Sequence, residues 1–358
     1  MSVRAMPIDK VRAGMQVSRA IYGASGETLL AAGITLTPRY IQRLQELGVL
    51  ALYIHDEEVG DLEINDVVSE KTRLQALKIT KEAMDNLKLS PALELSKVKS
   101  VVDDIIEELL SNKDVIVNLV DIRALNDYTF GHSVNVAILS LITGIAMGYE
   151  REKLCKLGTG ALFHDIGNTL LPENVLKQDR PLTDEEENLY QQHTVLGFKV
   201  LRKLENFSLS AAHVALQHHE RYNGSGYPRQ LPKESINEFA RIVAVTDLYD
   251  KLTSGWGGQP RCLPFQALEL IIANREKFFH PDVVENFMNT VAVFPIGTLI
   301  MLNTQEKGVV VQTCKEHPTR PRVRVLADSG GKRIVPPYEL DLALNPNCCI
   351  VRLLDEGN

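Results

Sequence analysis

The middle of this 358-residue chain carries histidines and aspartates in line with stripes of apolar residues at helical spacing. Five of its nine histidines, at positions 132, 164, 193, 218 and 219, carry this pattern within about 90 residues. In GHSVNVAILSLI, His132 shares one helical face with Val136 and Leu139, so its imidazole is expected to face the core. One inward histidine is usually an ordinary core residue. Only several inward histidines together indicate a metal site.

Two carboxylates extend the pattern. The stripe formed by Leu154, Leu157 and Ala161 continues onto Asp165, and a later stripe in EFARIVAVTDLYDKL leads to Asp247. Burying an unpaired carboxylate costs several kcal/mol, so each is expected to have a cationic partner or a metal. Asp250 is given no role, since a solvated carboxylate explains it equally well.

The remaining histidines lie near predicted helix ends. Thr183 and Glu186 form a capping box that opens a helix with His193 facing inward. His218 and His219 are expected at the end of a helix that Gly224 terminates. The candidate donors are therefore His132, His164, His193, His218, His219, Asp165 and Asp247. Nitrogen and oxygen donors without thiolate suit iron, manganese, zinc or nickel, and seven of them fit two ions that share a carboxylate.

The sequence as a whole predicts a mainly α protein with four segments. Residues 1–60 are expected to be a small α/β unit, with Thr37 as the N-cap of a helix that Gly48 ends. Residues 61–113 predict a connector of one or two helices, and residues 114–290 the helical core. Short apolar runs between Gly, Asn and Pro predict a β barrel or meander over residues 291–358.

Composition and charge limit the kinds of binding partner and the cellular location that we expect for this chain. A net charge of −7 without a block of Lys or Arg argues against binding a nucleic-acid polymer. There is no apolar run of the roughly 18 residues that a membrane helix needs, and the N-terminus does not resemble a signal peptide. The expected location is cytoplasmic. Five cysteines without a CxxC pair do not form a disulfide framework, and the oligomeric state stays open.

The motif HDIGN, with the distant HHERYNGSGYP, resembles the HD-GYP subfamily of the HD phosphohydrolase superfamily over residues 127–254. The resemblance implies a helical bundle with two or three metal ions, commonly iron or manganese, that hydrolyses cyclic di-GMP to pGpG or GMP. One ion would be held by His132, His164, Asp165 and Asp247, and the second by His193, His218 and His219, with Asp165 bridging. Two such ions can generate a bridging hydroxide, with His164 and Asp165 at the reacting centre. Tyr128 stands where three-metal relatives carry a glutamate, so two ions are expected.

The same resemblance points to substrate contacts. Asn168 stands where the family usually has a lysine that meets a phosphate, and DKLTSGWGGQPR replaces a segment resembling DALTSDRPYR. Asn168, Trp256 and Arg261 are therefore the expected substrate-binding residues. Gly224 and Gly226 are expected to permit turn conformations closed to other residues. The loop with Gly226, Tyr227 and Pro228 would form a wall of the cleft, contact a partner protein, or act as a rigid turn.

Three functions remain open at this point. The first is a phosphodiesterase for cyclic di-GMP or a related cyclic dinucleotide. The second is a phosphohydrolase of another nucleotide, suggested by the altered segment around Trp256. The third is a catalytically weak sensor or partner-binding module that keeps its metals for structure.

Overall fold

The computed structural model describes residues 3–22, 28–47, 49, 51–56, 62, 66–89, 93–112, 128–176, 180, 182–255, 262–314 and 317–354. These residues form two compact units. The helical unit contains the described residues of 68–113 and 128–290, and the second unit contains those of 1–67 and 291–358. About half of the structure is helical, and the predicted mainly α fold class, with a small N-terminal α/β part and a β-rich C-terminal part, is confirmed.

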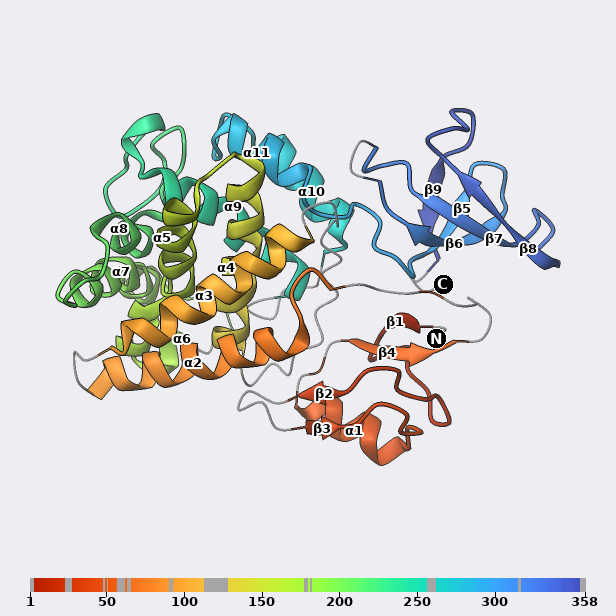
Figure 1. The fold of residues 1–358 in the computed structure, drawn as a ribbon, viewed down its shortest axis with the longest axis horizontal. Coiled ribbons are helices and arrows are strands. Elements are labelled where there is room, and N and C mark those ends of the chain that lie inside the picture. The colour runs from red at the N-terminus through yellow and green to blue at the C-terminus, as the bar shows by residue number, and fades with distance from the viewer. Residues whose placement is uncertain are drawn as a thin grey trace. The chain divides into compact units, whose positions relative to one another are not determined.

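The helical unit contains all of the candidate metal ligands. Its α-helices, α2 to α11, are labelled in Figure 1. Its long helices are α2 (Glu70–Leu89), α3 (Leu95–Ser111), α4 (Tyr128–Ala146), α5 (Arg151–Leu162), α7 (Asp184–Leu201) and α9 (Glu238–Ser254). Its shorter elements are η2 (Ile166–Leu170), α6 (Glu173–Leu176), α8 (Leu209–Gln217), η3 (Lys233–Ser235), α10 (Pro264–Ala273) and α11 (Pro281–Met288).

Helix α4 is the central element of this unit. All residues from 131 to 144 are buried, because α2, α3, α5, α9 and α11 all pack against this helix. A helix that is apolar all round belongs in the interior of a bundle, whereas one with a single apolar stripe lies at its surface. Polar side chains on the buried part of α4 are therefore shielded from water and depend on partners inside the protein, although Ser133 Oγ has no hydrogen-bond partner among the described residues.

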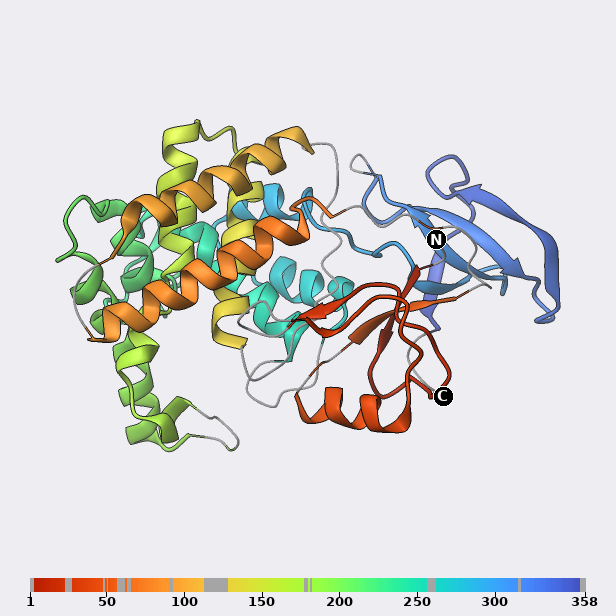
Figure 2. The same ribbon diagram turned by 60° about the horizontal axis from the view of Figure 1, so that its bottom comes forward.

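Helices α2 and α3 belong to the helical unit rather than standing apart from it. They lie side by side in both views and pack against each other (Figures 1 and 2). Helix α2 also contacts α4, and α3 contacts α5. The buried face of α3 consists of Val98, Val101, Val102, Ile105, Ile106 and Leu109. Its spacing of three and four residues is the amphipathic pattern that the sequence predicted.

The N-terminal residues form two short antiparallel strand pairs and one helix. Strand β1 (Val3–Pro7) pairs with β4 (Ala51–His55), and β2 (Ile21–Tyr22) pairs with β3 (Thr28–Leu30). Helix α1 (Pro38–Glu46) begins as predicted, because the side chain of Thr37 accepts a hydrogen bond from the backbone N–H of Tyr40. Gly48, the predicted end of this helix, lies outside the described residues.

The C-terminal residues form an antiparallel sheet in the order β8-β7-β6-β5-β9. Its strands are β5 (Leu299–Leu302), β6 (Lys307–Gln312), β7 (Arg322–Ala327), β8 (Arg333–Asp341) and β9 (Ile350–Leu353). Four of them follow one another as a meander, and β9 returns to pair with β5. Val323 and Val325 are buried two residues apart, as expected for a strand with one covered face.

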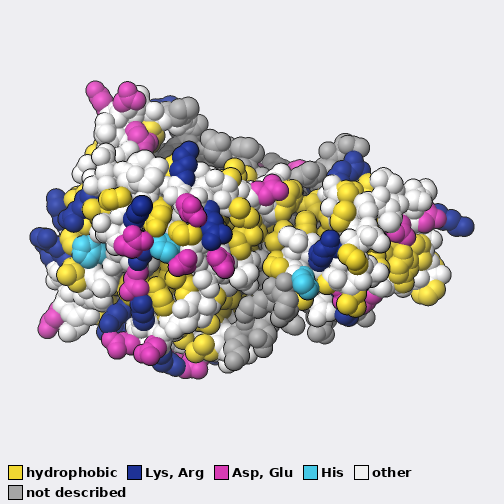
Figure 3. Space-filling view, turned by 90° about the horizontal axis from the view of Figure 1, so that it is seen from above, with side chains coloured by type: hydrophobic (Ala, Val, Ile, Leu, Met, Phe, Trp, Pro, Cys, Tyr) yellow, Lys and Arg dark blue, Asp and Glu magenta, His cyan; other side chains and the backbone are white. Residues whose placement is uncertain are grey.

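Among the helices of the described segments, none combines the length and the apolar character needed to cross a bilayer. On the face drawn in Figure 3, the Lys and Arg side chains are interspersed with Asp and Glu. A nucleic-acid polymer is usually bound by a single-sign basic patch, which this face does not present.

Candidate metal centre

All seven candidate ligands converge inside the helical unit, although they come from five separate parts of the chain. They are His132 on α4, His164 and Asp165 between α5 and η2, His193 on α7, His218 and His219 after α8, and Asp247 on α9. Each of these side chains is at most 8% exposed. The prediction that they face inward is thus correct for every one of them.

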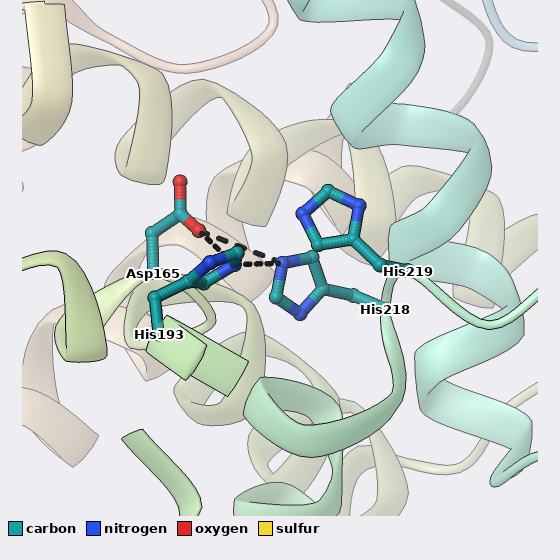
Figure 4. Close-up of side chains that lie close together, drawn as sticks. All are labelled: Asp165, His193, His218 and His219. Atoms are coloured by element: carbon teal, nitrogen blue, oxygen red, sulfur yellow. Dashed lines mark hydrogen bonds and ion pairs between the residues drawn. The ribbon is translucent and has the colours of Figure 1, made fainter. Parts of the chain in front are cut away.

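Asp165 lies between two groups of histidines. Its Oδ1 is 3.5 Å from Nε2 of His193 and 3.5 Å from Nε2 of His218 (Figure 4). Its Oδ2 is 3.5 Å from Nε2 of His164 and 3.9 Å from Nε2 of His132. Oδ1 is buried without a hydrogen-bond partner among the described residues. Each carboxylate oxygen therefore faces a different set of imidazoles.

The first group, which we call the His193 cluster, consists of Asp165, His193, His218 and His219. Its ligand atoms all lie within 4.8 Å of one another. The Nδ1–H of His193 donates to the carbonyl of Tyr190 at 2.7 Å, and that of His218 donates to the backbone at the end of α8. Because a carbonyl can only accept, Nδ1 holds the proton and the lone pair of Nε2 points toward Asp165.

Burial keeps these imidazoles neutral. It lowers the pKa of His193 to about 4 and also lowers the pKa of His218 and His219. His219 Nε2 is buried without a hydrogen-bond partner among the described residues. Neutral imidazoles with free inward-facing nitrogens are the form that a divalent ion binds.

The second group, the His132 cluster, consists of His132, His164 and Asp165, with Asp247 beside them. Asp247 Oδ1 lies 2.9 Å from Nε2 of His132 and 3.5 Å from Nε2 of His164. His164 is oriented like the other histidines, since its Nδ1–H donates to the carbonyl of Ala161 at 2.8 Å. Its Nε2 therefore also faces the two carboxylates.

His132 carries a proton at neutral pH in this arrangement. Burial alone would lower its pKa, but hydrogen bonds to Asp247 and Asp250 outweigh that effect and raise the pKa to about 9. The two bonds involve different ring nitrogens, Nε2 to Asp247 at 2.9 Å and Nδ1 to Asp250 at 2.7 Å. A metal that binds Nε2 must displace this proton.

Asp250 is a residue that the sequence reasoning missed. It is buried rather than solvated, and its second oxygen accepts a hydrogen bond from the Asn135 amide at 2.9 Å. A carboxylate that holds the far nitrogen of a ligand histidine fixes the orientation of the ring. The sequence feature that could have revealed Asp250 is its position three residues after Asp247, which places both carboxylates on one face of α9.

The helices end earlier than the sequence suggested. Helix α5 stops at Leu162, so His164 and Asp165 lie in the turn before η2 rather than on the helix face. Helix α8 stops at Gln217, and Gly224 lies farther along in a loop, with φ of +82°. Ending the helices here lets adjacent residues such as His218 and His219 reach the same place, which a continuing helix would prevent.

The loop after α8 holds His219 in place. Tyr227 stacks on the His219 ring, with centroids 4.7 Å apart and planes 23° apart. Glu220 is buried, and its carboxylate accepts hydrogen bonds from the backbone N–H of Arg229 and of Leu231. Pro228 follows Tyr227 and is partly buried.

Gly226 is required here for close packing, not for the turn conformation that we expected. A Cβ at this position would lie 2.4 Å from the backbone of His219 and of Arg221. Gly224 does have the positive φ that favours glycine.

Of the three predicted substrate-binding residues, only Asn168 lies among the described residues. Asn168 on η2 is 7% exposed, and its Oδ1 has no hydrogen-bond partner among the described residues. Trp256 and Arg261 lie outside the described residues. Lys251, which we had not singled out, points into the site, with Nζ 2.9 Å from the Asp247 carboxylate.

The donor set fits a pair of divalent ions. Burial opposes ionisation of Asp165 and Asp247, yet neighbouring histidines and Lys251 hold the pKa of both carboxyls well below the usual value. Two ionised carboxylates and several inward-facing nitrogens form a buried polar cluster that a cation would satisfy. Two of its ligand atoms have no hydrogen-bond partner among the described residues.

Comparison with known families agrees with this geometry. Residues 116–283 match the HD domain family, and residues 299–358 match a KOW domain associated with the HD domain. Residues 116–283 therefore form the part of the chain that resembles the HD domain family. The resemblance to the HD-GYP type, stated from the HDIGN and HHERYNGSGYP motifs, is thereby confirmed.

Several curated proteins are similar to part of this chain. Cyclic di-GMP phosphodiesterase PA4108 of Pseudomonas aeruginosa is 30% identical over 257 residues, 71% of this chain and 61% of the relative. The cyclic di-GMP phosphodiesterase response regulator RpfG of Xanthomonas campestris is 34% identical over 46% of this chain and 44% of the relative. The 3'3'-cGAMP-specific phosphodiesterase 1 of Vibrio cholerae is 34% identical over 41% of this chain and 34% of the relative. The chain thus spans less than two thirds of the length of these relatives.

Proposed function

We propose that this chain is a cytoplasmic, metal-dependent phosphodiesterase that hydrolyses cyclic di-GMP to pGpG or GMP. The observation that carries the proposal is the position of Asp165, whose two oxygens face two different histidine groups. Relatives named as cyclic di-GMP phosphodiesterases support the choice of substrate.

The ligand assignment follows the two clusters. One ion would be held by His132, His164, Asp165 and Asp247, and the other by Asp165, His193, His218 and His219. Imidazole and carboxylate donors without thiolate suit iron, manganese, zinc or nickel, and the resemblance to the HD-GYP subfamily favours iron or manganese among them. Two ions held in this way would provide a hydroxide nucleophile near neutral pH and neutralise charge on the phosphodiester.

The protein's own residues would orient these parts. The backbone carbonyls that accept from Nδ1 of His164 and His193 hold the rings so that Nε2 stays directed inward. Asn168 would donate a hydrogen bond to a phosphate oxygen, while Trp256 and Arg261 would contact the bases. The loop of Gly226, Tyr227 and Pro228 would cover the His193 cluster and could offer its outer side to a protein partner.

The test is to purify the protein without oxygen, measure its metals, and identify the products from cyclic di-GMP. We expect about two ions per chain and conversion to pGpG or GMP. The Asp165→Ala variant should lose both ions and the activity while keeping its helical circular dichroism. Asp103→Asn, which alters an ion pair with Arg151 and a hydrogen bond from the Cys155 thiol but no candidate ligand, is the control and should retain both. A wild-type protein with a filled site and no hydrolysis would instead support the non-catalytic module.

A second candidate is hydrolysis of another cyclic dinucleotide. The relative specific for 3'3'-cGAMP favours it, as does the segment DKLTSGWGGQPR, which departs from the family pattern. Comparing kcat/KM for cyclic di-GMP, 3'3'-cGAMP and cyclic di-AMP decides between them. A preference of tenfold or more for 3'3'-cGAMP would reassign the substrate while leaving the proposed metal chemistry in place.

A further inference from the structure

Lys251 lies one helical turn after Asp247 on α9, and its side chain points into the metal centre. We propose that Lys251 binds a phosphate group of the substrate, taking the place of the cation that position 168 does not supply in this chain. This inference rests on the proposed phosphodiesterase function and adds a substrate-binding residue to it.

The position of the ammonium group is the first support. Nζ lies 2.9 Å from the Asp247 carboxylate, and the side chain is 15% exposed. Lys251 is therefore in contact with a candidate ligand of the site, and part of its side chain is exposed to solvent.

The charge balance is the second support. Without a metal, the Lys251 ammonium is paired with Asp247. Once Asp247 shares its charge with a divalent ion, the ammonium is left beside cations in a poorly hydrated site, which is unfavourable unless an anion compensates it. A phosphodiester that enters the site would bring that anion to the place where it is needed.

The surroundings of Asn168 are the third support. Asn168 is nearly buried on η2 and carries no charge, and its Oδ1 has no hydrogen-bond partner among the described residues. It can donate to a phosphate oxygen but is not a cationic donor, so it cannot form an ion pair with the phosphate. Lys251 provides a cationic donor from helix α9.

The experiment uses the metal-loaded full chain and three variants. Lys251→Met keeps the aliphatic stem but removes the charge. Asn168→Lys combined with Lys251→Met moves the cation to position 168. Lys156→Met is the matched control, because Lys156 also forms an ion pair four residues away along a helix, with Glu152 on α5. Metal content, affinity for inorganic phosphate by calorimetry, and KM and kcat for cyclic di-GMP are measured for each.

We expect Lys251→Met to retain its metals but to bind phosphate on the order of tenfold to a hundredfold more weakly, the usual effect of losing one charged hydrogen bond. KM for cyclic di-GMP should rise with it. The double variant should recover phosphate affinity, and Lys156→Met should match the wild type.

Unchanged phosphate affinity in Lys251→Met would overturn the proposal. So would tighter metal binding with no loss of phosphate affinity, which would make Lys251 only a counter-ion for Asp247. If the wild type is inert toward cyclic dinucleotides, the proposed function fails, but the phosphate measurements still decide the role of Lys251.

Discussion

Asp250 shows how much of this site depends on a residue that is not itself a candidate ligand. Its carboxylate holds Nδ1 of His132 at 2.7 Å and is itself held by Asn135. We expect Asp250→Asn to lower manganese affinity about tenfold to a hundredfold, because the His132 ring would be held less firmly and would be less basic. Calorimetric titration with Mn²⁺ measures this, with Asp103→Asn as the exposed control. Equal affinities in the two variants would contradict an orienting role for Asp250.

The protonation of His132 gives the metal centre a definite pH dependence. Its pKa of about 9 means that a proton occupies the ring over the whole neutral range and competes with the metal. Affinity should therefore rise with pH and level off near 9, and metal uptake at pH 7.5 should release about one proton from this group.

Calorimetry with Mn²⁺ in buffers of different ionisation enthalpy counts the released protons. The other imidazoles with resolved shifts have lowered pKa values and should add little to the count. Uptake of metal with no proton release between pH 7 and 8 would show that His132 is not a ligand.

At the scale of elements, the close packing of η2 against α7 brings Asp165 near His193. A Cβ on Gly167 would lie 1.8 Å from the carbonyl oxygen of His193, whereas one on Gly197 would have its closest contacts at 3.2 Å. We expect Gly167→Ala to destabilise the protein by about 3 kcal/mol or more and to reduce metal content, because the backbone of α7 must move. Gly197→Ala should have a clearly smaller effect. Urea unfolding and metal analysis of both variants test this difference, and equal effects would refute it.

The loop after α8 depends on a second buried carboxylate. Glu220 accepts from two backbone N–H groups, so Glu220→Ala should cost about 2 kcal/mol or more and loosen the loop that carries Tyr227. Hydrogen exchange over residues 221–232 should increase. Glu205→Ala removes an exposed carboxylate outside this loop and is the control. Unaltered exchange in Glu220→Ala would mean that the loop is held by other contacts.

The sequence predicted the composition of the site better than its geometry. All seven ligand candidates converge because a polar residue at the end of an apolar stripe is buried whatever the topology of the helices. The ends of α5 and α8 were misplaced, since tertiary packing and not local propensity decides where those helices stop. Lys251 gave no signal of its own, and Asp250 gave only its spacing of three residues from Asp247, on a helix with charged residues at several positions. Only the fold shows which of these charges faces inward.

At the scale of the whole molecule, the metal should stabilise one unit and leave the other unaffected. All the ligands belong to the helical unit, while β5–β9 belong to the other. Saturating metal at a hundredfold above its dissociation constant would stabilise a folded unit by about 2.7 kcal/mol. Removing metal with a chelator should therefore increase hydrogen exchange in α4, α7, α8 and α9 but not in the sheet. A uniform increase across both units would contradict this separation.

Asp165 is the residue that the two clusters share, and this has a consequence for how the protein fills with metal. The first ion to arrive fixes the rotation of the carboxylate and leaves its other oxygen aimed at the vacant position. Filling should then be cooperative, so that molecules holding a single ion are scarce. A cell short of metal would contain a mixture of metal-free molecules and molecules with both ions bound. Its total activity would then change steeply with the metal concentration.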